Sequence, residues 1–133
     1  EKRIDQLNLK YQSKGYPVLA INSNDKQKQP GDSYEEMQKR AQSKNYSFPY
    51  LYDETQKVAA AYGASRTPHV YIVRKEAGSF IVSYIGAIDN NHQDADAVTV
   101  KYVENAVDNL LDNKPVETTF TKAIGCTIKW KDA

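Results

Sequence analysis

The stretch FPYLYDETQKVAAAYGASRTPHVYIV, residues 48–73, decides the fold that we expect for this chain. It begins with a short aromatic strand, Phe48–Tyr52. Asp53 with Gln56 then gives the start signal of a helix, and Gly63 gives its stop signal. Apolar residues at helical spacing predict which face of this helix is buried: Val58, Ala61 and Tyr62.

The second half of the stretch places a proline directly before a strand. Thr67-Pro68 is followed by the apolar strand 69–74, and a second strand is expected at 80–85 after a five-residue hairpin loop. Because proline lacks an amide donor, it is tolerated at the first residue of a strand or on an edge strand. A turn proline in this position is a candidate for a cis peptide bond.

The rest of the chain is predicted from the spacing of its apolar residues. We expect helices at 1–14, with Ile4, Leu7 and Tyr11 inward, and at 33–44, where Ser33 and Glu36 form a capping box and Tyr34, Met37 and Ala41 point inward. A last helix carries Val103, Ala106, Val107, Leu110 and Leu111 and stops before Pro115. The unbroken apolar strand Val18–Ile21 suggests burial on both faces. The segment 87–97 is a polar loop, and the tail 116–133 is irregular, with Ile124, Ile128 and Trp130 as candidate anchors.

Length and composition are those of one soluble globular domain. The chain has 133 residues, 40% of them hydrophobic and 26% charged, and a net charge of +1. This balance gives no reason to expect nucleic acid or a polyanionic surface as partner. No apolar run approaches the ~18 residues that a membrane span needs. The first helix has no start signal, so we expect the chain to begin within an element.

Three segments, VLAINSND at 18–25, residues 48–73 and GCTIKWK at 125–131, together resemble the redoxin family (alkyl hydroperoxide reductase/thiol-specific antioxidant, peroxiredoxin-like). The resemblance covers nearly the whole chain in the right order. It implies a single thioredoxin-like α/β domain over 1–133, with a mixed β-sheet and flanking helices. It also implies that the first strand and the start of the first helix are lacking.

The resemblance implies a thiol–disulfide or peroxide oxidoreductase whose nucleophilic cysteine lies at the N-terminus of the first helix, where the helix dipole favours thiolate. That position falls upstream of Glu1, and Cys126 is the only cysteine, so no CxxC pair is present. We therefore expect no catalytic residue within these 133 residues and no activity of the fragment. An alternative is a thioredoxin-fold module that binds proteins without redox chemistry; a third is a stable fragment with no function of its own.

In the family fold the lacking strand is central, between the strands at 18–22 and 69–74. Its absence leaves a gap of about 10 Å with unpaired backbone groups on both sides. We expect compensation in one of three ways: the two strands close up, another segment or a neighbouring chain fills the gap, or the domain is loose. An exposed edge would also favour self-association.

The family resemblance implies that Thr67 and Pro68 face the substrate, because in that family the backbone before this proline pairs with extended substrates by strand addition. Arg66 is next to this surface and could support a thiolate. Asn24 lies in the segment 22–25 after a strand, at the edge where open α/β sheets bind ligands. Turn formation explains the same Asn, Ser and Asp residues equally well.

Cys126 has three readings: a buried small side chain between Ile124 and Ile128, a resolving thiol, or a site of intermolecular pairing. His69 and His92 have no third ligand at metal spacing, so we expect no metal, and the resemblance implies no cofactor. It implies a thioredoxin-like electron donor or a protein disulfide as partner of the intact protein. The family occurs in the bacterial cytoplasm and in the cell envelope, and the compartment stays open.

Overall fold

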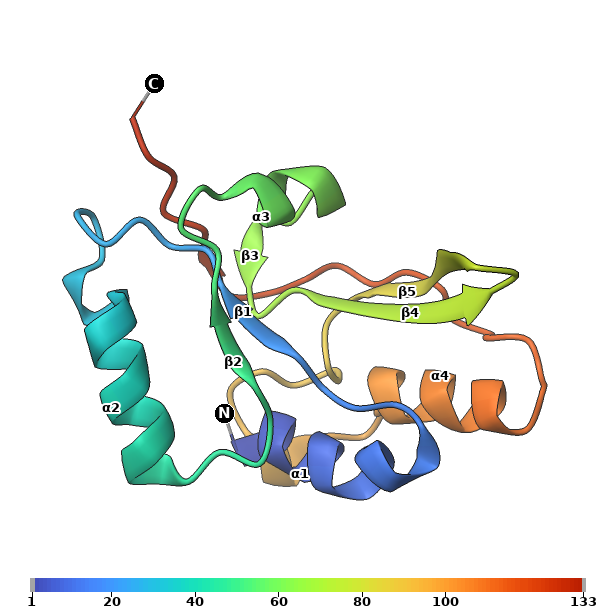
Figure 1. Cartoon of the computed structure of the whole chain (residues 1–133). Helices are drawn as coiled ribbons and strands as arrows, with labels where there is room; N and C mark the ends of the chain where they lie inside the picture. The colour runs from blue at the N-terminus through green and yellow to red at the C-terminus, as the bar shows by residue number, and fades with distance from the viewer. Residues whose placement is uncertain (1, 133) are drawn as a thin grey trace. The chain divides into compact units, whose positions relative to one another are not determined.

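The computed structural model describes residues 2–132 as a mixed α/β chain with short strands between helices (Figure 1). The chain divides into two compact units. The first unit contains the residues up to Ser65 and the tail from Ile128, and the second contains Arg66–Thr127. Among the described residues, no helix combines the length and apolar character that crossing a membrane requires.

The first unit pairs two short strands in parallel and surrounds them with helices. Its elements are α1 (Lys2–Tyr11), a 3-10 turn (Gln12–Lys14), β1 (Ala20–Asn22), a second 3-10 turn (Pro30–Asp32), α2 (Tyr34–Lys44), β2 (Tyr50–Tyr52) and α3 (Lys57–Tyr62). β1 and β2 are in register with Ile21 opposite Leu51, and α2 contacts β2. The first helix is therefore shorter than the predicted 1–14, and Glu1 lies outside the described residues.

The helix caps of the first unit follow the sequence signals closely. The Ser33 hydroxyl accepts a hydrogen bond from the Glu36 amide at 3.3 Å, which caps α2. Gly15 ends the first helical segment with φ +93°, a left-handed conformation that glycine adopts readily. Within α2, Met37 is buried as predicted, whereas Tyr34 is half exposed and that part of the prediction is wrong.

α3 differs from its prediction in its start and in its buried face. The helix begins at Lys57 rather than just after Asp53, because Gln56 at φ +62° turns the chain before it. The Asp53 carboxylate nevertheless caps the helix, since its oxygens accept from the amides of Val58 and Ala59. The expected buried stripe is wrong: Ala59 is buried, while Val58, Ala61 and Tyr62 are exposed.

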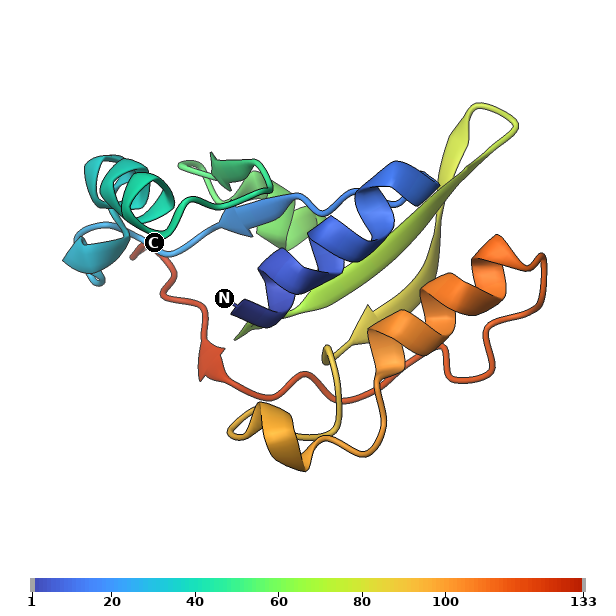
Figure 2. The same cartoon turned by 90° about the horizontal axis from the view of Figure 1, so that it is seen from below.

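The second unit is built on a long antiparallel hairpin and one amphipathic helix. Its elements are β3 (Arg66–Thr67), β4 (Val70–Glu76), β5 (Ser79–Gly86), a 3-10 turn (Ala95–Ala97), α4 (Tyr102–Leu111) and β6 (Cys126–Thr127). α4 contacts β5 and lies alongside the hairpin in both views (Figure 2). The loop between β4 and β5 is the two-residue turn Ala77-Gly78, with φ +48° and +84°, and not the five residues predicted.

The core of the second unit confirms the clearest helical pattern in the sequence. Val103, Ala106, Val107 and Leu110 are buried on one face of α4. Tyr84 of β5 is fully buried, and its hydroxyl is within 2.6 Å of both the Ala87 carbonyl and the Thr121 hydroxyl. The chain after α4 runs beside β5, where Ile85 forms a parallel bridge with Phe120.

The described strands form three separate two-stranded sheets. Within the described residues, β1 pairs with β2 and β4 pairs with β5, and β1 is not paired with β4. The prediction that β1 is buried on both faces is also wrong, because Leu19 is 60% and Ile21 is 45% exposed. Closing up of β1 and β4 by direct pairing is thus not found among residues 2–132, and the other forms of compensation stay predictions.

Candidate functional site

Three of the four predicted substrate-facing residues form one short segment of the second unit. Arg66 and Thr67 make up β3, and Pro68 follows directly. The Thr67–Pro68 peptide bond is cis. Thr67 and Pro68 are exposed, and Arg66 is half-buried. A surface strand end with an adjacent guanidinium is therefore available for binding chemistry.

β6 pairs with this segment and brings the only thiol of the chain to it. The antiparallel ladder places Thr67 opposite Cys126 and Arg66 opposite Thr127. Cys126 is exposed, so the prediction of a buried small side chain is wrong. Burial falls two residues later, at Ile128, which is 7% exposed. The sequence could not tell which residue of this apolar group is turned inward.

Gly125 allows the close approach of the two strands. A β-carbon at this position would overlap the Thr67 carbonyl oxygen, and φ is +153°. Both conditions favour glycine over any other residue. The dipeptide Gly125-Cys126 can therefore lie close to the backbone of Thr67, and a larger residue in place of Gly125 would prevent this approach.

His69 begins the strand after Pro68 and is held in a partly apolar environment. Its ring stacks on Tyr71 with centroids 5.0 Å apart. Burial lowers the pKa of His69 below its ordinary value of 6.5. A lowered pKa favours the neutral imidazole at physiological pH. His92, in the polar loop, is exposed. In the part of the chain that the structure describes, no three His, Cys, Asp or Glu side chains gather as a metal site would require.

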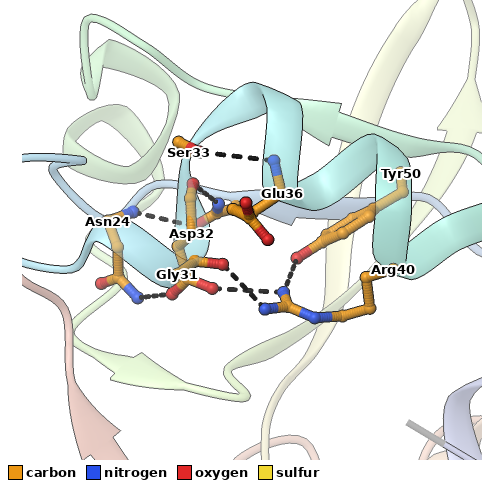
Figure 3. Close-up of polar contacts among 8 residues, drawn as sticks. Asn24, Gly31, Asp32, Ser33, Glu36, Arg40 and Tyr50 are labelled. Carbon is orange, nitrogen blue, oxygen red and sulfur yellow. Dashed lines mark hydrogen bonds and ion pairs between the residues drawn. The ribbon is translucent and has the colours of Figure 1, made fainter.

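Asn24, the fourth predicted residue, belongs to the first unit and has a structural role there. Its amide donates to the Asp32 carboxylate at 2.8 Å, and its carbonyl oxygen accepts from the Lys129 amide at 2.8 Å. The other Asp32 oxygen accepts from Arg40 at 3.2 Å, so Asp32 lies between the two side chains (Figure 3). Arg40 also reaches the Gly31 carbonyl and the Tyr50 hydroxyl. These contacts support the turn interpretation of residues 22–25.

The sequence indicated Gln56 only as part of a helix start, but in the structure its side chain also binds the C-terminal tail. It is 6% exposed, and its amide donates to the carbonyls of Ser23 and Lys129 at 2.7 and 2.9 Å. Its own oxygen accepts from the Lys131 amide at 3.0 Å. Gln56 therefore fastens the C-terminal tail within the first unit. No local pattern indicated this, because its partners are more than 30 residues away.

A shallow apolar hollow of about 360 Å³ lies on the first unit, lined by Ile21, Leu51, Tyr52, Asp53, Glu54, Thr55 and Val58. It has the apolar walls of a ligand site but lacks free polar groups that converge on it. Its buried carboxylate, Asp53, is already used by the Ser23 hydroxyl and two helix amides. The hollow is therefore a weaker candidate than the β3–β6 segment.

Comparison with known proteins agrees with the interpretation of the fold. The AhpC/TSA family model matches residues 2–90, which include Arg66, Thr67 and Pro68. A search of curated proteins found no match. Among solved structures, the chain is similar to an uncharacterized conserved protein from Geobacillus kaustophilus, with 41% identity and a TM-score of 0.88 over 98% of this chain and 68% of that one. It is also similar to a hypothetical protein from Sinorhizobium meliloti 1021, with 35% identity and a TM-score of 0.86 over 98% of this chain and 70% of that one. The chain has a thioredoxin-like fold and belongs to the AhpC/TSA family of redoxin-type oxidoreductases.

Proposed function

We propose that the intact protein is a thiol-dependent oxidoreductase that reduces peroxides or disulfides through a cysteine upstream of Glu1. The observation that carries this proposal is the family match over residues 2–90 in a chain whose only thiol, Cys126, follows the matched region. The first-helix N-terminus is where the family's chemistry requires a thiolate. Residues 1–133 then supply the surface around that thiol and not the thiol itself.

The proposed reaction with a peroxide balances with the upstream cysteine, a second thiol and one dithiol electron donor. The thiolate sulfur attacks one peroxide oxygen, the O–O bond breaks, and the other oxygen leaves as water or alcohol after taking a proton. The sulfur becomes a sulfenic acid, which condenses with a second thiol to a disulfide and releases water. A dithiol donor of the thioredoxin type then reduces the disulfide by thiol–disulfide exchange.

Arg66, Thr67, Pro68 and Cys126 have distinct roles in this proposal. The exposed residues Thr67 and Pro68 form the substrate-facing wall. Arg66 places a permanent positive charge beside it, and such a charge stabilises a thiolate and lowers its pKa. Cys126 is the candidate resolving thiol, since it is exposed and opposite Thr67. Asn24 contributes by fixing the loop and the tail in the first unit.

The test is a peroxidase assay on the full-length protein with its natural upstream sequence. Peroxide consumption is coupled to NADPH through thioredoxin and thioredoxin reductase, and residues 1–133 are assayed in parallel. We expect turnover of the full-length protein, none from residues 1–133, and loss of turnover when the upstream cysteine is replaced by serine. An active fragment, or a full-length protein inactive with peroxides and with disulfides, would overturn the proposal.

A second candidate is a thioredoxin-fold module that binds proteins without redox chemistry. The observation in its favour is that Cys126, the one thiol among residues 1–133, lies on a strand already paired within the chain. Reading the codons before Glu1 separates the two candidates. A cysteine at the first-helix N-terminus supports the oxidoreductase, and serine or alanine there supports the binding module.

A further inference from the structure

The C-terminal tail occupies the backbone edge that a polypeptide substrate would need. β6 pairs with β3 in antiparallel fashion, with Cys126 opposite Thr67. Strand addition to an exposed edge is how extended peptides commonly bind to sheets, through main-chain hydrogen bonds. In this chain a segment of the same polypeptide already makes those contacts with β3.

Beyond β6, main-chain groups of three tail residues hold the tail in the first unit: Ile128, Lys129 and Lys131. The Ile128 amide donates to the Ser65 carbonyl at 3.0 Å, and the Lys129 amide to Asn24 at 2.8 Å. The Lys129 carbonyl accepts from the Asp25 amide at 2.8 Å and from Gln56. The Lys131 amide donates to Gln56. On the tail's side these contacts are made by main-chain atoms, as for a bound peptide.

Burial of the tail's side chains is concentrated at one residue. Ile128 is buried, whereas Cys126, Thr127, Trp130 and Lys131 are exposed. One apolar anchor and a row of main-chain hydrogen bonds are the features of strand addition, in which the backbone gives affinity and a pocket for one side chain gives specificity. A segment held in this way can be exchanged for another of the same pattern.

We propose that the tail, residues 125–131, is a tethered competitor that covers β3 and must be displaced before an extended polypeptide can bind there. The fitting partner is a peptide strand with a β-branched aliphatic residue at the position of Ile128. This proposal rests on the proposed function only in taking the Thr67-Pro68 segment as the substrate-facing surface. Small substrates such as hydroperoxides need no strand pairing and are not subject to this competition.

Tethering makes the tail a strong competitor. An intramolecular strand acts at an effective concentration of about millimolar, so a free peptide meets a largely occupied edge. The apparent affinity for such a peptide falls in proportion to the fraction of molecules whose edge is open. Loosening the tail without altering β3 should therefore tighten peptide binding.

The experiment measures binding of a fluorescent peptide with the sequence of residues 124–131, carrying Cys126→Ser, to the chain of residues 1–133. Ile128→Ser removes the buried anchor of the tail. Ile124→Ser is the matched control, because Ile124 is 48% exposed against 7% for Ile128. Hydrogen exchange at residues 126–131 reports in each variant whether the tail is released. Circular dichroism reports whether the variant is folded.

We expect weak binding by the parent chain and by Ile124→Ser, and binding about tenfold tighter or more by Ile128→Ser together with faster exchange of the tail. If Ile128→Ser does not fold, the comparison is made between Gly125→Ala, whose added methyl group meets the Thr67 carbonyl, and Gly31→Ala, which meets nothing within 4 Å. If the tail is released but the peptide binds the loosened variant and its control with equal affinity, the proposal is overturned. Slow hydrogen exchange of the tail in both Ile128→Ser and Gly125→Ala would also overturn the proposal, because the tail would then be a fixed part of the fold.

These results separate from those of the proposed function. The binding assay involves no turnover and no upstream cysteine, so a protein without peroxidase activity can still show displacement of its tail by the peptide. Conversely, an active peroxidase whose tail never yields to the peptide would leave the proposed function intact and reject this inference.

Discussion

Cys126 lies directly opposite Thr67 in the antiparallel ladder of β3 and β6, one residue from Pro68. The only thiol of the chain is thus located beside the segment that the redoxin resemblance marks as substrate-facing. The side chain is exposed, although the apolar neighbours Ile124 and Ile128 suggested burial. This placement makes the reactivity of Cys126 a direct test of the tail's position.

Cys126 should react with a thiol reagent in the native protein. We expect Ellman's reagent to modify one thiol per chain without denaturant, because the side chain is open to solvent. The release of thionitrobenzoate is followed at 412 nm on the order of minutes, with the urea-unfolded chain as reference. Modification that occurs only after unfolding would contradict the exposed position of Cys126.

Replacing Asp53 should destabilise the first unit. Its carboxylate is 7% exposed and accepts from the Ser23 hydroxyl at 2.8 Å and the Ala59 amide at 3.0 Å. Asp53→Asn loses the charge-assisted bonds and turns a donor toward a donor, so we expect a loss of about 2 kcal/mol in the free energy of unfolding. Urea denaturation gives the value. Glu54→Gln, an exposed neighbour, is the control and should change stability by less than about 0.5 kcal/mol.

Local signals predicted those elements whose stability comes from nearby residues. α4 was found because its buried residues recur at helical spacing, and α2 because Ser33 caps it. The predicted buried face of α3 is wrong. This six-residue helix follows a turn at Gln56, and it buries Ala59 instead of Val58. The sequence shows spacing but not the orientation of so short a helix.

The candidate site was predictable in part. Arg66, Thr67 and Pro68 were identified because a proline before an apolar strand is a strong local feature. The pairing of Thr67 with Cys126 was not, because the two residues are 59 positions apart and nothing local specifies that contact. The same limit applies to Gln56, whose bonds to the tail decide its role.

Asp5 should make the first unit sensitive to acid. Its carboxylate accepts from the hydroxyl and the amide of Ser47, and these bonds lower the pKa of Asp5 below its ordinary value of 3.8. A lowered pKa in the folded state means that the stabilisation is present above the unfolded pKa and is lost as the pH falls through the folded pKa. We expect Asp5→Asn to be less stable than the parent at neutral pH, and the two to converge as the pH falls through the lowered pKa of Asp5 in the folded state.

Thermal unfolding of both chains across this pH range measures the convergence. Ser47→Ala is the matched control, because it removes the hydroxyl that contributes most to the shift and keeps the backbone amide. The effect of Asp5→Asn should be smaller in that background. A stability difference that stays constant from neutral pH into the acid range would contradict the assignment to Asp5.

Gly86 should be the least replaceable glycine of the second unit. It ends β5 with φ +151°, and a β-carbon there would overlap the side chain and the backbone of Thr121. Thr121 cannot easily move aside, because its hydroxyl is held by Tyr84 at 2.6 Å and by the Ala87 amide at 2.9 Å. Its amide also donates to the Ile85 carbonyl at 3.0 Å. The added methyl group must therefore distort a bonded network around a fully buried tyrosine.

We expect Gly86→Ala to lower the free energy of unfolding by at least about 2 kcal/mol, from crowding and from backbone strain together. Gly31→Ala is the control, since a β-carbon there meets nothing within 4 Å, and it should change stability by no more than about 1 kcal/mol. Urea denaturation followed by circular dichroism compares the two. Equal stabilities of the two variants would mean that the segment 119–121 does not pack against β5 as closely as its hydrogen bonds indicate, and the Tyr84–Thr121 contact would then have to be a loose one.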